Sequence, residues 1–190
     1  IVGGYADDSF QGAAWIFTRS GTTWTQQGAK LVGTGAVGTA RQGRAVSISA
    51  DGNTAIVSGN RDNSDQGAAW IFTRSGSTWT QQGAKLVGTG AVGNAQQGRV
   101  VSLSADGNTA ILGGNRDNSD QGAAWIFTRS DTTWTQQGAK LVGTGNTGAA
   151  EQGVAVSLSA DGTTAILGGN LDNTNQGAAW VFTRSGTTWS

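Results

Sequence analysis

The sequence predicts an all-β protein: a β-propeller built from four-stranded antiparallel blades with a repeat of about 55 residues. Three observations predict this fold. The tetrapeptide Gly-Ala-Ala-Trp begins at Gly12, Gly67, Gly122 and Gly177, a constant step of 55 residues. Each repeat holds four short segments rich in apolar, β-branched or aromatic residues, separated by turns that contain glycine. No stretch shows the 3.6-residue period of an amphipathic helix.

The repeat also defines the domain organisation. We expect a single repeat domain over residues 1–190, with a partial unit at 1–11, repeats at 12–66, 67–121 and 122–176, and a partial unit at 177–190. The first two full repeats differ at about seven positions, and the second and third at about twelve. Similarity this close indicates either recent duplication or deliberate design, and the residues alone favour neither.

Four strands are expected in each unit. In the best-defined unit they are Arg44–Ala50, Thr54–Gly59, Gly67–Arg74 and Thr78–Val87. The sequence Asp51-Gly52-Asn53 between the first two is a hairpin turn, because Asp-Gly readily adopts the positive φ of tight hairpins. The first two strands carry mainly small side chains, whereas the last two carry the Trp and Phe residues. A propeller blade needs this gradient, because the gap between neighbouring blades widens with distance from the axis. A β-solenoid is the rival architecture, but its rungs are usually shorter than 55 residues.

Composition excludes several classes of function. The chain has 12 basic and 12 acidic residues, which argues against a nucleic-acid partner. No apolar run approaches the roughly 20 residues of a membrane span, so no membrane insertion is expected. The chain lacks His and Cys and has one Glu, Glu151. Its Asp residues recur in near-identical surroundings, whereas acid–base catalysis needs carboxylates in unlike environments. We therefore expect no catalytic residues, and a protein that is not an enzyme.

The run QGRAVSISADGNTAIVSGNRDNSDQGAAWIFTRSGSTW, residues 42–79, resembles the bacterial FG-GAP repeat proteins, which are related to the propeller of integrin α-subunits. The resemblance implies a propeller fold and a secreted or cell-surface location in a bacterium. Three features depart from the family pattern, and one of them is Ser58-Gly59-Asn60 (Gly113-Gly114-Asn115 in the next repeat), which stands where the family has Gly-Ala-Pro. Gln42-Gly43 stands where the family has Phe-Gly, and the family's Ca²⁺ loop has shrunk to Ala50–Asn53 with one carboxylate. Since Ca²⁺ takes six to eight oxygen ligands, no metal and no cofactor are expected.

The most polar segment of the repeat is a candidate ligand site. It spans residues 60–66 and recurs at 115–121 and 170–176. It could contact a sugar or a cation at several points on one face, or it could be an ordinary polar loop, since Asp, Asn and Ser favour turns. The candidate residues are the Asp-Asn pairs that persist in every copy: Asp62, Asn63, Asp117, Asn118, Asp172 and Asn173.

Paired tryptophans are the second candidate. Each unit carries two Trp residues nine positions apart, and the central pairs are Trp70 with Trp79 and Trp125 with Trp134. If the turn between their strands has an even number of residues, both rings lie on one hairpin face. Arg74 could then form a cation–π contact there. An exposed indole would offer a platform for a sugar ring, whereas buried indoles would pack neighbouring blades together.

These observations predict a non-enzymatic repeat protein for extracellular recognition or adhesion, with multivalent glycan binding as its sharper form. The expected partner is a carbohydrate or a surface protein. The alternative is a self-assembling scaffold or filament, or a designed repeat protein, without a small-molecule ligand. With the four strands of each blade numbered in chain order, the first blade of the chain has only strands two to four. Two full blades follow, and the last blade has strands one to three plus a stub of the fourth. Because such a set cannot close a ring neatly, self-association through the terminal blades is expected.

Overall fold

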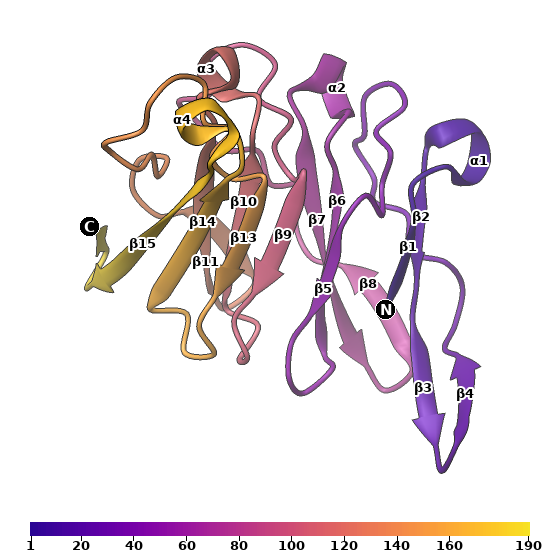
Figure 1. Ribbon diagram of the computed structural model, residues 1–190. Coiled ribbons are helices and arrows are strands. Elements are labelled where there is room, and N and C mark those ends of the chain that lie inside the picture. The colour runs from indigo at the N-terminus through magenta and orange to yellow at the C-terminus, as the bar shows by residue number, and fades with distance from the viewer.

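A computed structural model describes residues 1–190 and shows an all-β fold of antiparallel sheets (Figure 1). We call its four successive groups of strands units A to D. Unit A has two two-stranded sheets, and units B to D have one four-stranded sheet each. The strands of unit A are β1 (Val2–Gly4), β2 (Ala13–Trp15), β3 (Phe17–Ser20) and β4 (Thr23–Gln26). Those of unit B are β5 (Val46–Ile48), β6 (Thr54–Gly59), β7 (Ala68–Ser75) and β8 (Thr78–Gln81). Those of unit C are β9 (Val100–Leu103), β10 (Thr109–Gly114), β11 (Ala123–Ser130) and β12 (Thr133–Gln136). Those of unit D are β13 (Ala155–Leu158), β14 (Thr164–Gly169), β15 (Ala178–Ser185) and β16 (Thr188–Trp189).

The predicted strands of unit B are present, in the predicted order, but the first and the fourth are shorter than expected. The first spans Val46–Ile48 instead of Arg44–Ala50, and the fourth ends at Gln81 instead of Val87. Gly83 has φ +74°, which turns the chain out of the ladder, and Leu86 returns to pair with Ala69 as an isolated bridge. The antiparallel four-stranded order β5-β6-β7-β8 excludes the rival solenoid.

The turn between β5 and β6 forms as predicted. Gly52 has φ +69°, and the Asp51 carboxylate accepts hydrogen bonds from the Ser49 hydroxyl (2.6 Å) and the Asn53 backbone N–H (2.9 Å). Arg74 of β7 donates to the Asn53 side chain at 2.8 Å. The turn is therefore tied both to itself and to the third strand.

Helix was not expected anywhere, yet each unit has one four-residue helical turn, between β1 and β2 in unit A and between the second and third strands in units B to D. These turns are α1 (Asp7–Phe10), α2 (Asp62–Asp65), α3 (Asp117–Asp120) and α4 (Asp172–Asn175). They lie together at one end of the sheets, in the upper part of Figure 1. None of them has the length or apolarity that crossing a bilayer requires.

The core lies between the units. Trp70 and Phe72 of unit B pack on Ala14, Ile16 and Leu31 of unit A. The opposite face of the same sheet, with Ile56 and Ile71, packs on Trp125 and Phe127 of unit C, and the pattern repeats between units C and D. Each sheet between two others is thus apolar on both faces.

Trp70 shows how closely the units approach. Its indole is fully buried, and its Nε1–H donates to the Thr34 carbonyl at 2.7 Å. A Cβ on Gly33 would lie 2.1 Å from the ring, and one on Gly59 would lie 2.9 Å from it. The ring therefore fills the gap between the unit A linker and its own sheet. Burying a Trp side chain contributes on the order of 4–6 kcal/mol of transfer free energy.

The outer faces of the first and last units are exposed. Trp24 of unit A is 63% exposed and Val181 of unit D is 61% exposed, and Figure 1 shows the sheets side by side as an open fan. The expected order of strands is present, including the two-residue β16 as the stub. The structure therefore establishes the stacked antiparallel sheets of a blade-like repeat without a closed ring.

Candidate functional site

The turn that carries the predicted Asp-Asn pair has left-handed backbone geometry. In α2 the φ angles of Asn63, Ser64 and Asp65 are +50°, +55° and +69°, and α1, α3 and α4 share this conformation. Left-handed geometry costs roughly 1–2 kcal/mol per residue for most side chains, and Asn and Asp tolerate it best. The composition of this segment therefore has a backbone reason.

The persistent Asp of the pair holds the turn in place. Asp62 is fully buried; one carboxylate oxygen accepts the Val37 N–H at 2.7 Å and the other pairs with Lys85. Asp117 is buried in the same way, with Val92 N–H and Lys140. Asp172 is also buried and accepts the Thr147 N–H at 2.7 Å. These three carboxylates join the turn to the preceding linker, and none of them is open to a ligand.

The Asn that follows each Asp lies at the surface. Asn63 donates to the Gln66 side chain at 2.8 Å, Asn118 to Gln121 at 2.7 Å, and Asn173 to Gln176 at 2.8 Å. Each of these side chains is exposed on the outside of its turn. The Asp and the Asn of one pair thus point to different surroundings and do not form one site.

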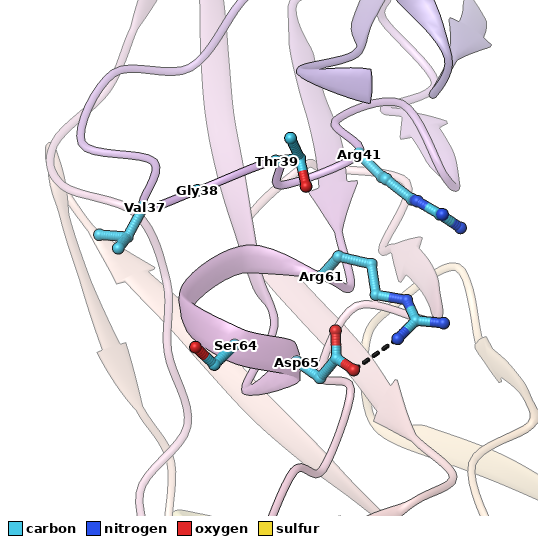
Figure 2. A pocket seen from close by; sticks show the side chains of 7 residues that line it. All are labelled: Val37, Gly38, Thr39, Arg41, Arg61, Ser64 and Asp65. Atoms are coloured by element: carbon cyan, nitrogen blue, oxygen red, sulfur yellow. Dashed lines mark hydrogen bonds and ion pairs between the residues drawn. The ribbon is translucent and has the colours of Figure 1, made fainter. Parts of the chain in front are cut away.

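An open pocket of about 400 Å³ lies between this turn and the preceding linker (Figure 2). Arg41 from the linker and Arg61 from the turn extend along its side, and Arg61 is paired with Asp65. The remaining lining residues are Val37, Gly38, Thr39 and Ser64. The next repeat forms an equivalent pocket of about 510 Å³ from Val92, Gly93, Asn94, Gln96, Arg116, Ser119 and Asp120. We call these the first and second end pockets.

The predicted tryptophans fall into two groups. Trp70 and Trp125 are fully buried between units, so in this structure they serve packing and offer no surface to a sugar. Trp79 and Trp134 are partly buried at the outer edge, where the turn before β8 has two residues and places Trp79 opposite Arg74. The Arg74 guanidinium lies 5.9 Å from the Trp79 ring centroid, and Arg129 lies 5.4 Å from that of Trp134. The expected cation–π geometry is present.

The outer tryptophans line a second kind of repeated pocket. Trp79, Ser77 and Thr78 of unit B face the segment Gln27–Leu31 of unit A across a groove of about 360 Å³. Trp134, Thr132 and Thr133 face the segment Gln82–Leu86 across a groove of about 380 Å³. In each groove the indole N–H donates to the Gln of the preceding unit at 2.9 Å. We call these the rim grooves.

The structure has no group of three or more His, Cys, Asp or Glu side chains that could hold a metal ion. Asp51 and its counterparts Asp106 and Asp161 are engaged in their own turns. Hydrogen bonds from Ser159 and Thr163 lower the pKa of Asp161 to about 2, so it is ionised at neutral pH. These carboxylates stabilise the hairpin turns.

Sequence reasoning missed both the end pockets and the buried glutamines. Gln42, fully inside the protein, accepts the Gly33 N–H at 2.5 Å and donates to the Gly33 carbonyl at 2.8 Å, which closes the linker. Gln97 and Gln152 do the same for Gly88 and Gly143. The signal available in the sequence was the invariance of this Gln against the variation of the residue before it, which is Arg41, Gln96 or Glu151.

Comparison with known proteins assigns no family. No family model matches the chain, and no curated protein matches it. Among solved structures, the putative TolB from Agrobacterium tumefaciens is 14% identical with a TM-score of 0.48, over 99% of this chain and 59% of that one. TolB from Acinetobacter baumannii is 14% identical with a TM-score of 0.41, over 86% of this chain and 35% of that one. This chain thus spans less than two thirds of the length of either protein.

Proposed function

We propose that the chain is a non-enzymatic, propeller-type recognition protein that binds carbohydrate through its rim grooves. The observation that carries the proposal is the repetition of one groove with the same Trp, Gln and Lys between successive units. Trp189 and Gln137 repeat the indole contact between units C and D at 2.9 Å. Identical weak sites displayed several times gain avidity for a ligand that is itself repetitive.

The groove chemistry fits a sugar ring. The partly buried Trp79 indole supplies an apolar surface for the C–H face of a pyranose. The other residues that line the groove supply amide, hydroxyl and ammonium groups for sugar hydroxyls. Few polar groups around an aromatic surface are typical of small-ligand sites.

Three features support a binding role over an enzymatic one. The chain has no His. The buried Asp62 and Asp117 are each paired with a Lys. Most of the remaining carboxylates recur in similar turns from unit to unit, whereas acid–base catalysis requires two carboxylates held in contrasting environments at one site. We further propose, from the FG-GAP resemblance, that the protein acts at a bacterial cell surface or after secretion.

The test is binding to an array of neutral glycans, followed by variants. Trp79→Ala with Trp134→Ala should lower the signal at least tenfold, whereas Trp79→Phe with Trp134→Phe should retain most of it. Trp24→Ala is the matched control, because Trp24 holds the same repeat position on the exposed face of unit A and lines no rim groove. Absence of any glycan signal from the parent protein would overturn the proposal, as would an equal loss in the Trp24→Ala protein.

A second candidate, self-association of the chain, is favoured by the exposed faces of units A and D. Unit D exposes Ile166 and Val181, and Ile166 lines a shallow apolar pocket of about 220 Å³. These two positions correspond to Ile56 and Ile71, which are buried against unit C. Unit A presents Trp15 and Trp24, the counterparts of Trp70 and Trp79. The face of unit A on one copy therefore matches the face of unit D on another.

Sedimentation across a range of concentrations tests this candidate. Mass should rise with concentration in the parent protein and stay at one chain in Val181→Asp. Thr132→Asp, at an exposed turn, is the control and should behave as the parent. A parent protein of one-chain mass at every concentration would contradict self-association and leave the carbohydrate proposal untouched.

A further inference from the structure

The second end pocket lies where the repeats diverge most. Its lining has seven residues, and six of them differ from their counterparts 55 positions later; only Gly93 is unchanged, as Gly148. By contrast, the eight lining residues of the two rim grooves differ at one position, Ser77 against Thr132. In repeat proteins the face on which units vary is often the binding face. The residues of the end pockets therefore differ more between repeats than those of the rim grooves.

Arginine gathers around the end pockets of the first two repeats. Arg41 and Arg61 line the first pocket and Arg116 lines the second, while Arg44 and Arg99 precede the innermost strands β5 and β9. We call these five residues the arginine cluster. The third repeat has Glu151, Val154 and Leu171 at the corresponding positions, so the cluster is confined to one side of the fan.

The cluster has more positive than negative charge. Arg61 is paired with Asp65, and Arg116 with Asp120 and Glu151. The side chains of Arg41, Arg44 and Arg99 have no ion pair within 4.0 Å and no hydrogen bond to a protein acceptor. Burial, followed by the charge of Arg44, lowers the pKa of Arg99, with smaller contributions from Arg116 and Arg61, against an opposing effect of Glu151. The guanidinium groups of Arg44, Arg61 and Arg116 therefore lie close enough to Arg99 to repel it.

Two further features leave N–H donors of Arg41, Arg44 and Arg61 available to a ligand. The Arg41 guanidinium lies over the Phe10 ring at 5.1 Å and that of Arg44 over the Tyr5 ring at 5.8 Å. Both aromatic residues are particular to unit A, since Asn60 and Asp65 occupy these positions in unit B. Stacking leaves the edge of a guanidinium free to donate in its own plane. In addition, the Arg61 Nε atom is buried and has no acceptor.

We propose that the arginine cluster binds an oxyanion, a carboxylate or a sulfate carried by the ligand, at the mouth of the first end pocket. A guanidinium presents a planar fork of donors that matches such a group, and an acceptor there would satisfy Arg61 Nε and relieve the repulsion among the cations. The inference stands on the end pockets alone and is independent of carbohydrate binding in the rim grooves.

The chain itself supplies the substitutions for a test. Arg41→Gln copies Gln96, and Arg44→Val and Arg99→Val both copy Val154. Each replacement already occupies the equivalent position in another repeat, and none breaks an ion pair, so the variants should fold. Arg19→Gln removes the same charge from an exposed position on β3 of unit A and serves as the control.

The measurement is a titration of the ¹⁵N-labelled protein with sulfate, acetate and glucuronate at low ionic strength, read from the Arg Nε–H signals. Saturable shifts at Arg41, Arg44 and Arg61 are expected, and Arg41→Gln with Arg44→Val should weaken binding more than tenfold, while Arg19→Gln leaves it unchanged. Glucuronate binding more tightly than acetate and sulfate would identify an acidic sugar as the source of the oxyanion; equal binding would identify the bare anion. Shifts that do not saturate, or that persist in the double variant, would overturn the proposal.

Discussion

The buried carboxylate of Asp62 shows how one side chain can connect separate parts of this fold. Asp62 accepts a backbone N–H from the preceding linker and pairs with Lys85 of the following strand segment, so one side chain joins three parts of the chain. The repeat tolerates variation at the position before this Asp, where Arg61, Arg116 and Leu171 are partly or fully exposed.

We predict that Asp62→Ala lowers the free energy of unfolding by about 3 kcal/mol, because it leaves the Val37 N–H and the Lys85 ammonium without their acceptor. Asp172→Ala is the matched variant: Asp172 accepts the Thr147 N–H but has no Lys partner, so about 1 kcal/mol is expected. Urea unfolding of the two variants measures the difference, and equal losses would show that the ion pair contributes nothing.

The position of Gly88, where two units pack closely together, has no space for a larger side chain. A Cβ on Gly88 would lie 2.1 Å from the Trp125 ring, whereas a Cβ on Gly90 would meet nothing within 4 Å. We predict that Gly88→Ala costs about 3 kcal/mol through displacement of the ring, and Gly90→Ala about 1 kcal/mol through its positive φ alone. Thermal unfolding should rank the two variants in that order; the reverse order would place the strain in the backbone.

The elements of the repeat are fixed largely by turns. The hairpins at Asp51, Asp106 and Asp161 are closed by side-chain hydrogen bonds to the carboxylate, and such bonds favour its ionised form. The left-handed turns α2 to α4 are closed instead by burial of their first Asp and by the backbone tolerance of the Asn that follows it. The strands therefore end where the side-chain contacts and backbone geometry of these turns require, and not where strand propensity falls.

The hairpin carboxylates predict a loss of stability in acid. The folded-state pKa of Asp161 is about 2, below the ordinary value of about 3.9 in an unfolded chain. Its contribution is therefore fully present above about pH 4 and disappears as the pH falls through about 2. Urea unfolding between pH 5 and pH 2 should show a shallower decline in Asp161→Asn than in the parent; identical slopes would contradict the assignment.

At the scale of the whole molecule, stability is distributed unevenly. Units B and C have apolar neighbours on both faces, whereas units A and D each expose one face. In stacked repeats the total stability is approximately a sum of unit and interface terms, so units with one interface open first.

We predict that amide hydrogen exchange in dilute solution is slowest in β6, β7, β10 and β11 and fastest in β1 and β15. Mass spectrometry of peptides from each strand measures this directly. Uniform protection across all four units would mean that the chain unfolds as one cooperative body or that its end faces are covered.

The period of 55, the four-strand unit, the Asp-Gly hairpin and the blade-like stacking of small and large residues were all predictable from the sequence. Each depends on interactions between neighbours in the chain or on the apolar pattern of one strand. The end of β8 and the left-handed turns were not predictable, because both depend on Gly83, Asn63 and Ser64 adopting positive φ within a folded context. Similarly, the sequence identified the Asp-Asn pair but could not separate a buried anchor from an exposed amide.

The sequence by itself determined the repeat, the all-β class, the strand order and the lack of His and Cys chemistry, because these are properties of composition and period. Only the tertiary structure decided which Trp of each pair is buried, which carboxylates are engaged, and that Arg41, Arg44, Arg61, Arg99 and Arg116 lie at one end of the fan. The physical reason is that these properties arise from contacts between units. Such contacts join residues that are far apart in the sequence, and they form only when the sheets stack.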